Sequence, residues 1–343
     1  MDSGFIIEKS IFIVVIFAFT MVMAMYSTWA ERKVAAYLQD RVGPNRAGWG
    51  GLLQPLADGM KLFAKEEFEP NTKNKFLFFV GPAIAMSTAL MTSAVIPWGD
   101  KLEIFGRTVY LQATDLDVSL LYIFGVVSIG VYGIMIGGWA SNNKFSLMGA
   151  VRAASQMVSY EVAMGLSMIA LLMMTGTLSL KEISIQQHGW HWNVIYQPVS
   201  FLIFLICAFA ETNRTPFDLA ECESELIGGY HTEYSSMKMG FYLFAEYANM
   251  FISATIISVL FFGGYNYPGM SWALENWGVN IANVIGIGAL FIKLCFFIFF
   301  FMWIRWTIPR FRYDQLMNLG WKILIPLSIV NIIITGICIL AFK

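Results

Sequence analysis

Eight separate segments of this chain are each long and apolar enough to cross a lipid bilayer as a helix. They lie at residues 10–29, 76–96, 118–139, 156–175, 194–210, 239–262, 281–303 and 320–340. The segment at 194–210 is the shortest, since about 20 residues at 1.5 Å per residue are needed to span the hydrocarbon. No Gly/Ser-rich or Pro-rich linker divides the chain. We therefore expect an all-α integral membrane protein with a single polytopic domain over residues 1–343.

The charged residues are few and unevenly placed. They make up 13% of the 343 residues, about half the fraction usual in a soluble domain. Most of the 22 Lys and Arg residues fall in the odd-numbered connections between the eight segments. Because positively charged loops stay in the cytoplasm, we expect the odd connections inside and both termini outside, in a bacterial plasma (inner) membrane.

The connection over residues 211–238 carries an unusual cluster of acids. Its carboxylates are Glu211, Asp218, Glu221, Glu223, Glu225 and Glu233. Only Arg214 and Lys238 oppose them in the same stretch. Acids beside hydrocarbon are costly and are usually functional, so the cluster points to proton or substrate handling. A solvated acidic face is the simpler alternative.

A short helix is predicted within this connection. Thr215-Pro216 reads as an N-cap followed by a first-turn proline, and Gly228-Gly229 would end the helix after Leu226 or Ile227. Glu221 and Glu225 would then share a face and repel each other. Such repulsion favours retention of a proton by one of the two carboxyl groups.

Three further charges fall inside predicted spans. Glu161 and Glu246 lie in the cytoplasmic halves of their segments, and Lys293 lies near the middle of its own. A line of acids from the loop toward the midplane is what a proton path requires. Buried ion pairs that lock helices together are the alternative, and would suit Lys293 with one acid.

Residues 51–67 predict an amphipathic helix. Leu52, Leu53, Leu56, Met60 and Phe63 share one face, whereas Gln54, Asp58, Lys61 and Lys65 share the other. This pattern is typical of a helix lying in the membrane interface. The helix could be a plain membrane anchor, or its apolar face could form the floor of a cavity that opens to the lipid. The nearby Arg32, Arg41 and Arg46 could likewise be ordinary cytoplasmic anchors or could line a passage for a polar headgroup.

No pattern for a metal or an electron carrier is present. The four cysteines are scattered, and the three histidines lack the spacing of a metal site. We expect no metal and no nucleic acid to bind, so any electron chemistry must take place in a partner protein.

Three stretches resemble a known family. Residues 31–46 (ERKVAAYLQDRVGPNR), 53–63 (LQPLADGMKLF) and 210–226 (AETNRTPFDLAECESEL) are similar to signature stretches of the H-type membrane subunit of the proton-pumping NADH–quinone oxidoreductases, respiratory complex I. The mitochondrial counterpart is subunit 1. Cys222 stands where small residues such as Gly are usual in that family.

The resemblance implies a function. A subunit of this family would sit where the peripheral redox arm meets the membrane arm, at the entrance of the quinone chamber. The acidic connection and Glu161 would begin the proton-coupling path. The passage for ubiquinone or menaquinone would be bordered by Arg32, Arg41, Arg46, Asp58 and Arg214. Electrons would come from NADH through FMN and iron–sulfur clusters in partner subunits.

Alternatives from other classes remain open at this point. A secondary transporter could use Glu161, Glu246 and Lys293 as an ion site, but would be expected to have broken helices in inverted repeats. A structural anchor would leave the buried acids idle. A related subunit of a membrane-bound hydrogenase or formate-linked complex would work without quinone.

Overall fold

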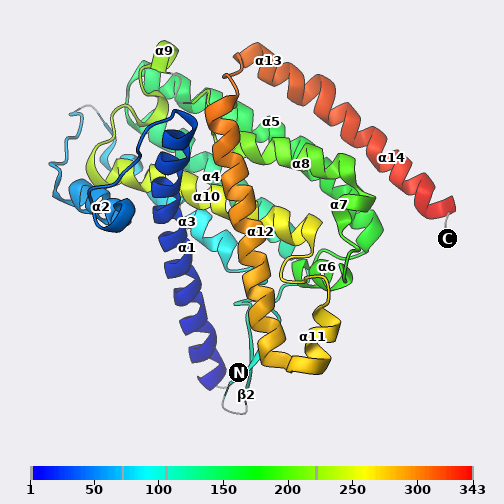
Figure 1. The fold of residues 1–343 in the computed structure, drawn as a ribbon. Helices are drawn as coiled ribbons and strands as arrows, with labels where there is room; N and C mark the ends of the chain where they lie inside the picture. The colour runs from blue at the N-terminus through cyan, green and yellow to red at the C-terminus, as the bar shows by residue number, and fades with distance from the viewer. Residues whose placement is uncertain (1–2, 72, 105–106, 221–222, 342–343) are drawn as a thin grey trace.

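The computed structural model describes residues 3–71, 73–104, 107–220 and 223–341, and these are predominantly helical (Figure 1). Seven helices in the described residues are long and apolar enough to span a membrane. They are α1 (Ser3–Leu38), α3 (Lys75–Ser93), α4 (Ser119–Ala140), α5 (Lys144–Thr175), α10 (Ser236–Phe262), α12 (Val279–Thr307) and a continuous last helix of α13 (Tyr313–Asn318), the π-helical η3 (Leu319–Leu324) and α14 (Ile325–Ala341). The all-α class is confirmed, together with seven of the eight predicted segments.

The eighth segment is shorter than a full span. Residues 194–210 fall on α7 (Asn193–Tyr196) and α8 (Pro198–Glu211), which are separated at Gln197. Gln197 has φ −129°, and Pro198 starts a new helix because its ring fixes a helical φ and needs no amide donor. The 14 residues of α8 reach about 21 Å, less than the ~30 Å of a bilayer core. A crossing by α8 therefore stays a prediction.

Shorter elements gather at two opposite ends of the molecule. Figure 1 shows α9 (Glu223–Leu226) and α13 at one end, which we call the acidic-loop end. The antiparallel hairpin of β1 (Lys101–Ile104) and β2 (Arg107–Tyr110) lies with α11 (Met270–Trp277) at the other, the hairpin end. The remaining short elements are η1 (Trp49–Gly51), α2 (Gln54–Ala64), α6 (Leu180–Gln186) and η2 (Gly229–His231).

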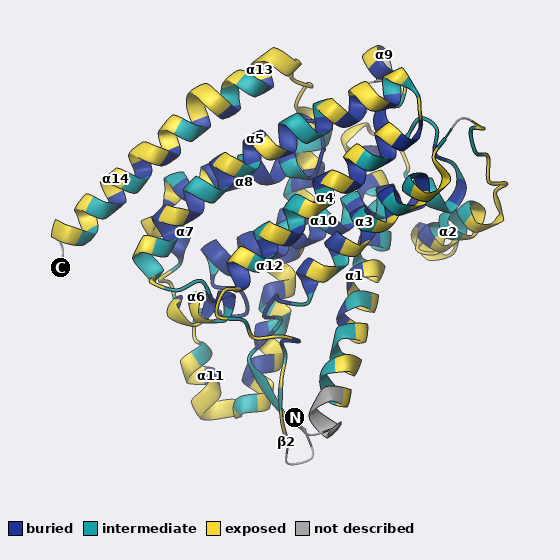
Figure 2. Ribbon diagram, turned by 180° about the vertical axis from the view of Figure 1, so that it is seen from behind, coloured by how far each residue is buried: buried dark blue, intermediate teal, exposed yellow. Residues whose placement is uncertain are grey.

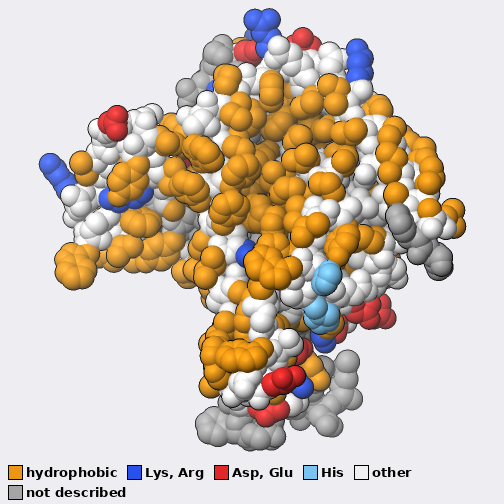
Figure 3. Space-filling view, turned by 45° about the vertical axis from the view of Figure 1, so that its right-hand side comes forward, with side chains coloured by type: hydrophobic (Ala, Val, Ile, Leu, Met, Phe, Trp, Pro, Cys, Tyr) orange, Lys and Arg blue, Asp and Glu red, His pale blue; other side chains and the backbone are white. Residues whose placement is uncertain are grey.

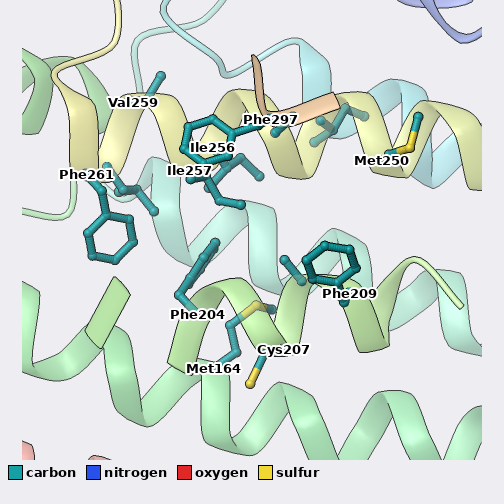
Figure 4. Packing of buried hydrophobic residues seen from close by; sticks show 14 of the residues in the cluster. Met164, Phe204, Cys207, Phe209, Met250, Ile256, Ile257, Val259, Phe261 and Phe297 are labelled. Carbon is teal, nitrogen blue, oxygen red and sulfur yellow. The ribbon is translucent and has the colours of Figure 1, made fainter. Parts of the chain in front are cut away.

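The buried core lies where α10 meets α5, α8 and α12. Of the long helices, α10 is the most deeply covered, whereas α1 and the last helix are mostly exposed (Figure 2). Figure 4 shows Phe204 of α8 pointing toward Ile257 and Phe261 of α10, whereas Cys207 of α8 points toward α5, which carries Met164. This packing fixes the depth at which α8 ends and the acidic loop begins.

Glycines allow α3 and α4 to pack closely. A Cβ at Gly137 would lie 1.9 Å from the hydroxyl of Tyr242, and one at Gly81 would lie 2.9 Å from the Cα of Gly137. Small residues that let backbones approach are the usual contact between membrane helices. Tyr242 of α10 uses this space and donates to the carbonyl of Gly133 at 3.1 Å.

The outer surface is that of a multi-pass membrane protein. Figure 3 shows a broad hydrophobic surface between the two ends of the molecule, with most of the acidic and basic side chains at those ends. Large apolar side chains of α14 such as Ile333 and Leu340 are exposed. In a bilayer these residues face hydrocarbon, so their exposure carries no cost.

The alternative in which Lys293 pairs with a buried acid is not what the described residues show. Its ammonium donates instead to the carbonyls of Phe262, Gly264 and Asn266, at 2.7, 2.8 and 2.6 Å. These carbonyls belong to the irregular chain that follows the end of α10 at Gly263, which has φ 75°. Irregular backbone at membrane depth needs internal partners, and one lysine supplies three donors.

Candidate functional site

A buried ion pair stands at the acidic-loop end, next to α8. Arg214 donates from Nη1 to Oε2 of Glu31 on α1 at 2.5 Å, and both side chains are about 95% covered. Arg305 of α12 binds the other oxygen of Glu31. Tyr247 of α10 stacks on the Arg214 guanidinium, 3.9 Å from its ring centroid. Burial lowers the pKa of Arg214, but Glu31, Tyr247 and Glu246 together raise it above its ordinary value, so the arginine stays charged.

The turn after Arg214 is buried and not helical, so the predicted helix start at Thr215 is wrong. The helix α9 covers only Glu223–Leu226. The backbone carbonyl of Phe217 accepts from Gln156 Nε2 at 2.7 Å, and that of Pro216 accepts from the amide of Phe311 at 3.1 Å. Because other elements bind these carbonyls, they are not available to a local helix.

The acids of this loop are partnered by residues from other parts of the chain. Asp218 is buried and pairs with Arg310 at 3.0 Å. Glu225 pairs with Arg152 of α5 at 2.5 Å, so Arg152 points to the loop and not toward Glu161. Glu233 accepts from Asn143 Nδ2 at 2.6 Å. On sequence alone, the acids had too few cationic partners because only Arg214 and Lys238, within the loop itself, were considered.

Two of the predicted acids lie partly or wholly outside the described residues. Glu221 falls outside them, as does Cys222, so the contact of Glu221 with Glu225 stays a prediction. The backbone of Glu223 belongs to α9.

Glu211 closes α8 and lines a small internal cavity that also has other polar side chains in its wall. It is half-buried, and it lines a cavity of about 30 Å³ together with Tyr230, Glu246 and Asn249. A second cavity of about 20 Å³ also has Glu211 and Asn249 in its wall. A water needs roughly 10–15 Å³ of such volume, so each cavity has room for at least one. Glu211 thus stands between two small hydratable spaces.

Glu246 and Glu161 both lie near Glu211. The hydroxyl of Tyr230 donates to Oε1 of Glu246 at 2.9 Å. On α5, Glu161 accepts a short hydrogen bond from the hydroxyl of Ser128 on α4. Glu161 and Glu211 lie close enough for their charges to interact. No basic side chain pairs with Glu161 among the residues that the structure describes.

A separate pocket opens between α1, α2 and α10. Its volume is about 170 Å³, and most of its wall is apolar, including Leu62 and Phe244. The exceptions include Arg32 and Asp58, which pair at 2.6 Å, and Tyr247. Tyr247 therefore separates this pocket from Arg214, which lies against its ring.

The helix α2 borders this pocket with one side and exposes the other. It is shorter than the predicted 51–67. The predicted apolar stripe is largely exposed, for example 68% at Met60 and 73% at Phe63. Asp58, on the opposite side, faces the pocket. The apolar stripe is thus available to lipid.

Arginines gather in the loop before α2. Arg32, Arg41 and Arg46 line an open hollow with Asn45 and Gln54. Arg32 lines both this hollow and the pocket beside α2. The five predicted passage residues therefore divide into two groups, with Arg214 behind Tyr247 and the other four around α2.

Several residues of the site were missed in the sequence. Glu31, Tyr247, Asn249, Tyr230 and Ser128 all contact or border the predicted acids and arginines. Glu31 carried one signal, because it is a carboxylate at the end of an apolar segment. The others are ordinary polar residues of helices or loops and carried none.

Comparisons with known proteins all identify the same family. The family model described as NADH dehydrogenase matches residues 11–336. The H-type subunit of NADH-quinone oxidoreductase from Flavobacterium psychrophilum is 84% identical over 343 residues, covering 100% of both chains. The H-type subunit numbered 1 in Cytophaga hutchinsonii is 64% identical and covers 98% of each chain. The H-type subunit numbered 1 in Geobacter sulfurreducens is 46% identical, and the match covers 95% of this chain and 93% of the Geobacter protein. The chain therefore belongs to the NADH dehydrogenase family, as an H-type subunit of NADH-quinone oxidoreductase, the membrane subunit of respiratory complex I that its signature stretches resemble.

Proposed function

We propose that this subunit forms the membrane entrance of the quinone chamber and the first part of the proton-coupling path of complex I. One observation carries the proposal. Ionisable side chains continue from the pocket beside α2, through Arg214 and Glu31, to Glu246, Glu211 and Glu161. Charged groups at such depth are retained when they serve transport or catalysis.

The pocket between α1, α2 and α10 is the candidate passage. A quinone has an apolar tail and a polar ring, and the pocket combines apolar walls with the Arg32–Asp58 pair and the side chain of Tyr247. The exposed apolar stripe of α2 supports a position in the membrane interface, where the tail enters from the lipid. Arg41 and Arg46 extend the polar side of this mouth.

Charge changes at the passage can reach the acids inside the protein. Reduction of a quinone to a quinol takes up protons as well as electrons, so the charge near Arg214 and Glu31 changes during turnover. Glu246 and Glu211 share a cavity that has room for water, and Glu211 interacts with Glu161. In a region of low dielectric such neighbouring carboxylates exchange protons in response to nearby charge.

The chain would supply the passage and the acids, and partner subunits would supply the electrons. No described group of His, Cys, Asp or Glu side chains has the arrangement of a metal site. We propose that NADH reaches the quinone through FMN and iron–sulfur clusters in peripheral-arm subunits, docked at the acidic-loop end. The exposed Arg152–Glu225 pair and Arg310 are available there for contact.

Topology follows from the same proposal. With α8 as an eighth crossing, the acidic loop and the connection before α13 fall on one side, and the hairpin and α11 fall on the other, as Figure 1 draws them. The excess of Lys and Arg at the odd connections then places the acidic-loop end in the bacterial cytoplasm and both termini outside.

Two substitutions test the proton path. Glu161→Gln and Glu211→Gln should leave the complex assembled but lower quinone reduction and proton pumping together, by about 100-fold, which is typical for loss of a proton-transfer group. Glu161→Asp should keep part of both activities because it can still ionise. Glu275→Gln, on the exposed part of α11, is the matched control.

The results that contradict the proposal are distinct. If the variants reduce the amount of complex on a native gel while the surviving complex turns over normally, Glu161 and Glu211 have a structural role. Normal pumping in both variants would exclude them from the path. The hydrogenase-type alternative predicts activity without quinone, and the names of the relatives favour the quinone version.

A further inference from the structure

A purely apolar groove lies at the hairpin end, far from the acidic loop. It has a volume of about 220 Å³ and runs between α1 and α12, with the connection before and after the hairpin as its floor. Phe12, Ile16 and Phe19 line one wall, and Ile287 and Leu294 line the other. Trp98 forms part of the floor, where its ring packs against Phe19 and Phe251 at 5.6 and 5.8 Å.

The groove has the length of a lipid chain within one leaflet. From Phe12 to Phe19 is about 10 Å along α1 at 1.5 Å per residue. One leaflet contributes about 15 Å of hydrocarbon. Lys9 lies one turn beyond Phe12, so its position along the helix is about 15 Å from Phe19. A cation therefore stands at the level of the headgroup when the groove lies in the hydrocarbon.

Lys9 is held on the side of the groove. Its ammonium donates to the carbonyl of Gln112 at 2.8 Å, and the preceding residue, Leu111, lines the groove. This contact keeps a positive charge next to the groove, one residue from Leu111 of its lining. A phosphate group is attracted to such a charge near the membrane surface.

We propose that this groove binds one acyl chain of a phospholipid, with the phosphate of that lipid beside Lys9. The chemistry of the lining distinguishes this occupant from others. The walls contain only large apolar residues, whereas contacts between membrane helices use small ones such as glycine and alanine. The walls also have no hydrogen-bonding side chain directed to a quinone ring apart from the Trp98 indole.

Lipid retention by the purified complex tests the site. Native mass spectrometry counts the phospholipids that remain after detergent washing and after re-addition of phosphatidylglycerol. Ile287→Trp fills the groove and should remove one retained phospholipid per complex. Val284→Trp, which adds the same ring to an exposed position on α12, should retain as many as the unmodified complex. Val15→Trp fills the same groove from α1 and serves if Ile287→Trp does not assemble.

A separate variant tests the contact of Lys9 with the lipid phosphate. Lys9→Gln should weaken retention of phosphatidylglycerol about five-fold, as expected for loss of one cation near the membrane surface. Equal lipid retention by the groove-filling variants and the control overturns the proposal, and so does recovery of quinone in place of phospholipid. No effect of Lys9→Gln overturns the assignment of the phosphate. None of these results bears on the quinone passage beside α2.

Discussion

Replacement of Lys293 by methionine should loosen the chain where α10 ends. Methionine keeps the length and the apolar stem of lysine but has no donor. The carbonyls of Phe262, Gly264 and Asn266 would then lose the hydrogen bonds that the ammonium gives them. Water does not replace these bonds because Gly264 and Asn266 are buried.

The size of the effect follows from the three bonds. An orphaned buried acceptor costs about 1–3 kcal/mol, so three cost about 3–9 kcal/mol. The variant also no longer buries an ammonium, which recovers several kcal/mol. If the recovery is about 3 kcal/mol and the cost is near the middle of its range, about 6 kcal/mol, the expected net loss is about 3 kcal/mol. It corresponds to an opening equilibrium shifted by roughly 100-fold.

Hydrogen exchange measures this local opening in the intact complex. The amides of Gly264 and Asn266 are bonded to the carbonyls of Ser258 and Gly263, at 2.8 and 2.9 Å. They should exchange about 100-fold faster in Lys293→Met, because local opening exposes both. Lys293→Arg keeps the charge and its donors and should restore part of the protection. Ile292→Met changes the neighbouring residue, which is 72% exposed, and should have no effect.

Unchanged exchange over residues 262–266 in Lys293→Met would refute this reasoning. Faster exchange around one of the buried acids, in place of this segment, would show that Lys293 acts as an ion-pair partner instead.

Three further predictions concern the site and the loop between α2 and α3. Trp in place of Leu56 or Met60 on α2 should raise the apparent KM for a long-tailed quinone more than for a short-tailed analogue, and equal effects would favour a plain membrane anchor. Glu225→Gln removes a partly exposed pair with Arg152 that is worth about 1 kcal/mol or less, so assembly should be unchanged while quinone-linked turnover and pumping fall, and normal turnover would contradict this. Lys238 and Lys73 lower the pKa of Glu69 from its ordinary 4.5 to about 2, so ionised Glu69 stabilises the contact of the first loop with α10 above pH 4.5, and this contribution is lost as the pH falls toward 2. Proteolysis of residues 65–74 in the complex should increase over that acid range, whereas Glu69→Gln should be cleaved readily at every pH.

The sequence determined the class of the protein and the approximate place of its spans. Long apolar runs have one stable solution in a bilayer, because every backbone polar group must be bonded within the segment. Seven predicted runs therefore correspond to long helices of the structure. The family also followed from sequence, since long stretches such as 31–46 retain their order and spacing.

Local signals failed where tertiary contacts competed with them. The turn and cap signals at Thr215-Pro216 predicted a helix, but Gln156 and Phe311 bind the carbonyls that a helix would have used. The predicted span at 194–210 divides at Gln197, whose side chain binds Thr335 of the last helix at 2.9 Å. Neither partner is near in sequence, so no local pattern contained the information.

The partners of the charged residues were decided only by the folded chain. Glu31 meets Arg214 across 183 residues, and Lys293 meets three carbonyls that no side-chain pattern reveals. Composition shows which charges a membrane protein keeps, because burial makes each one costly. Which partner lowers that cost depends on the distance and direction between helices, and these are set by packing among α1, α5, α8, α10 and α12.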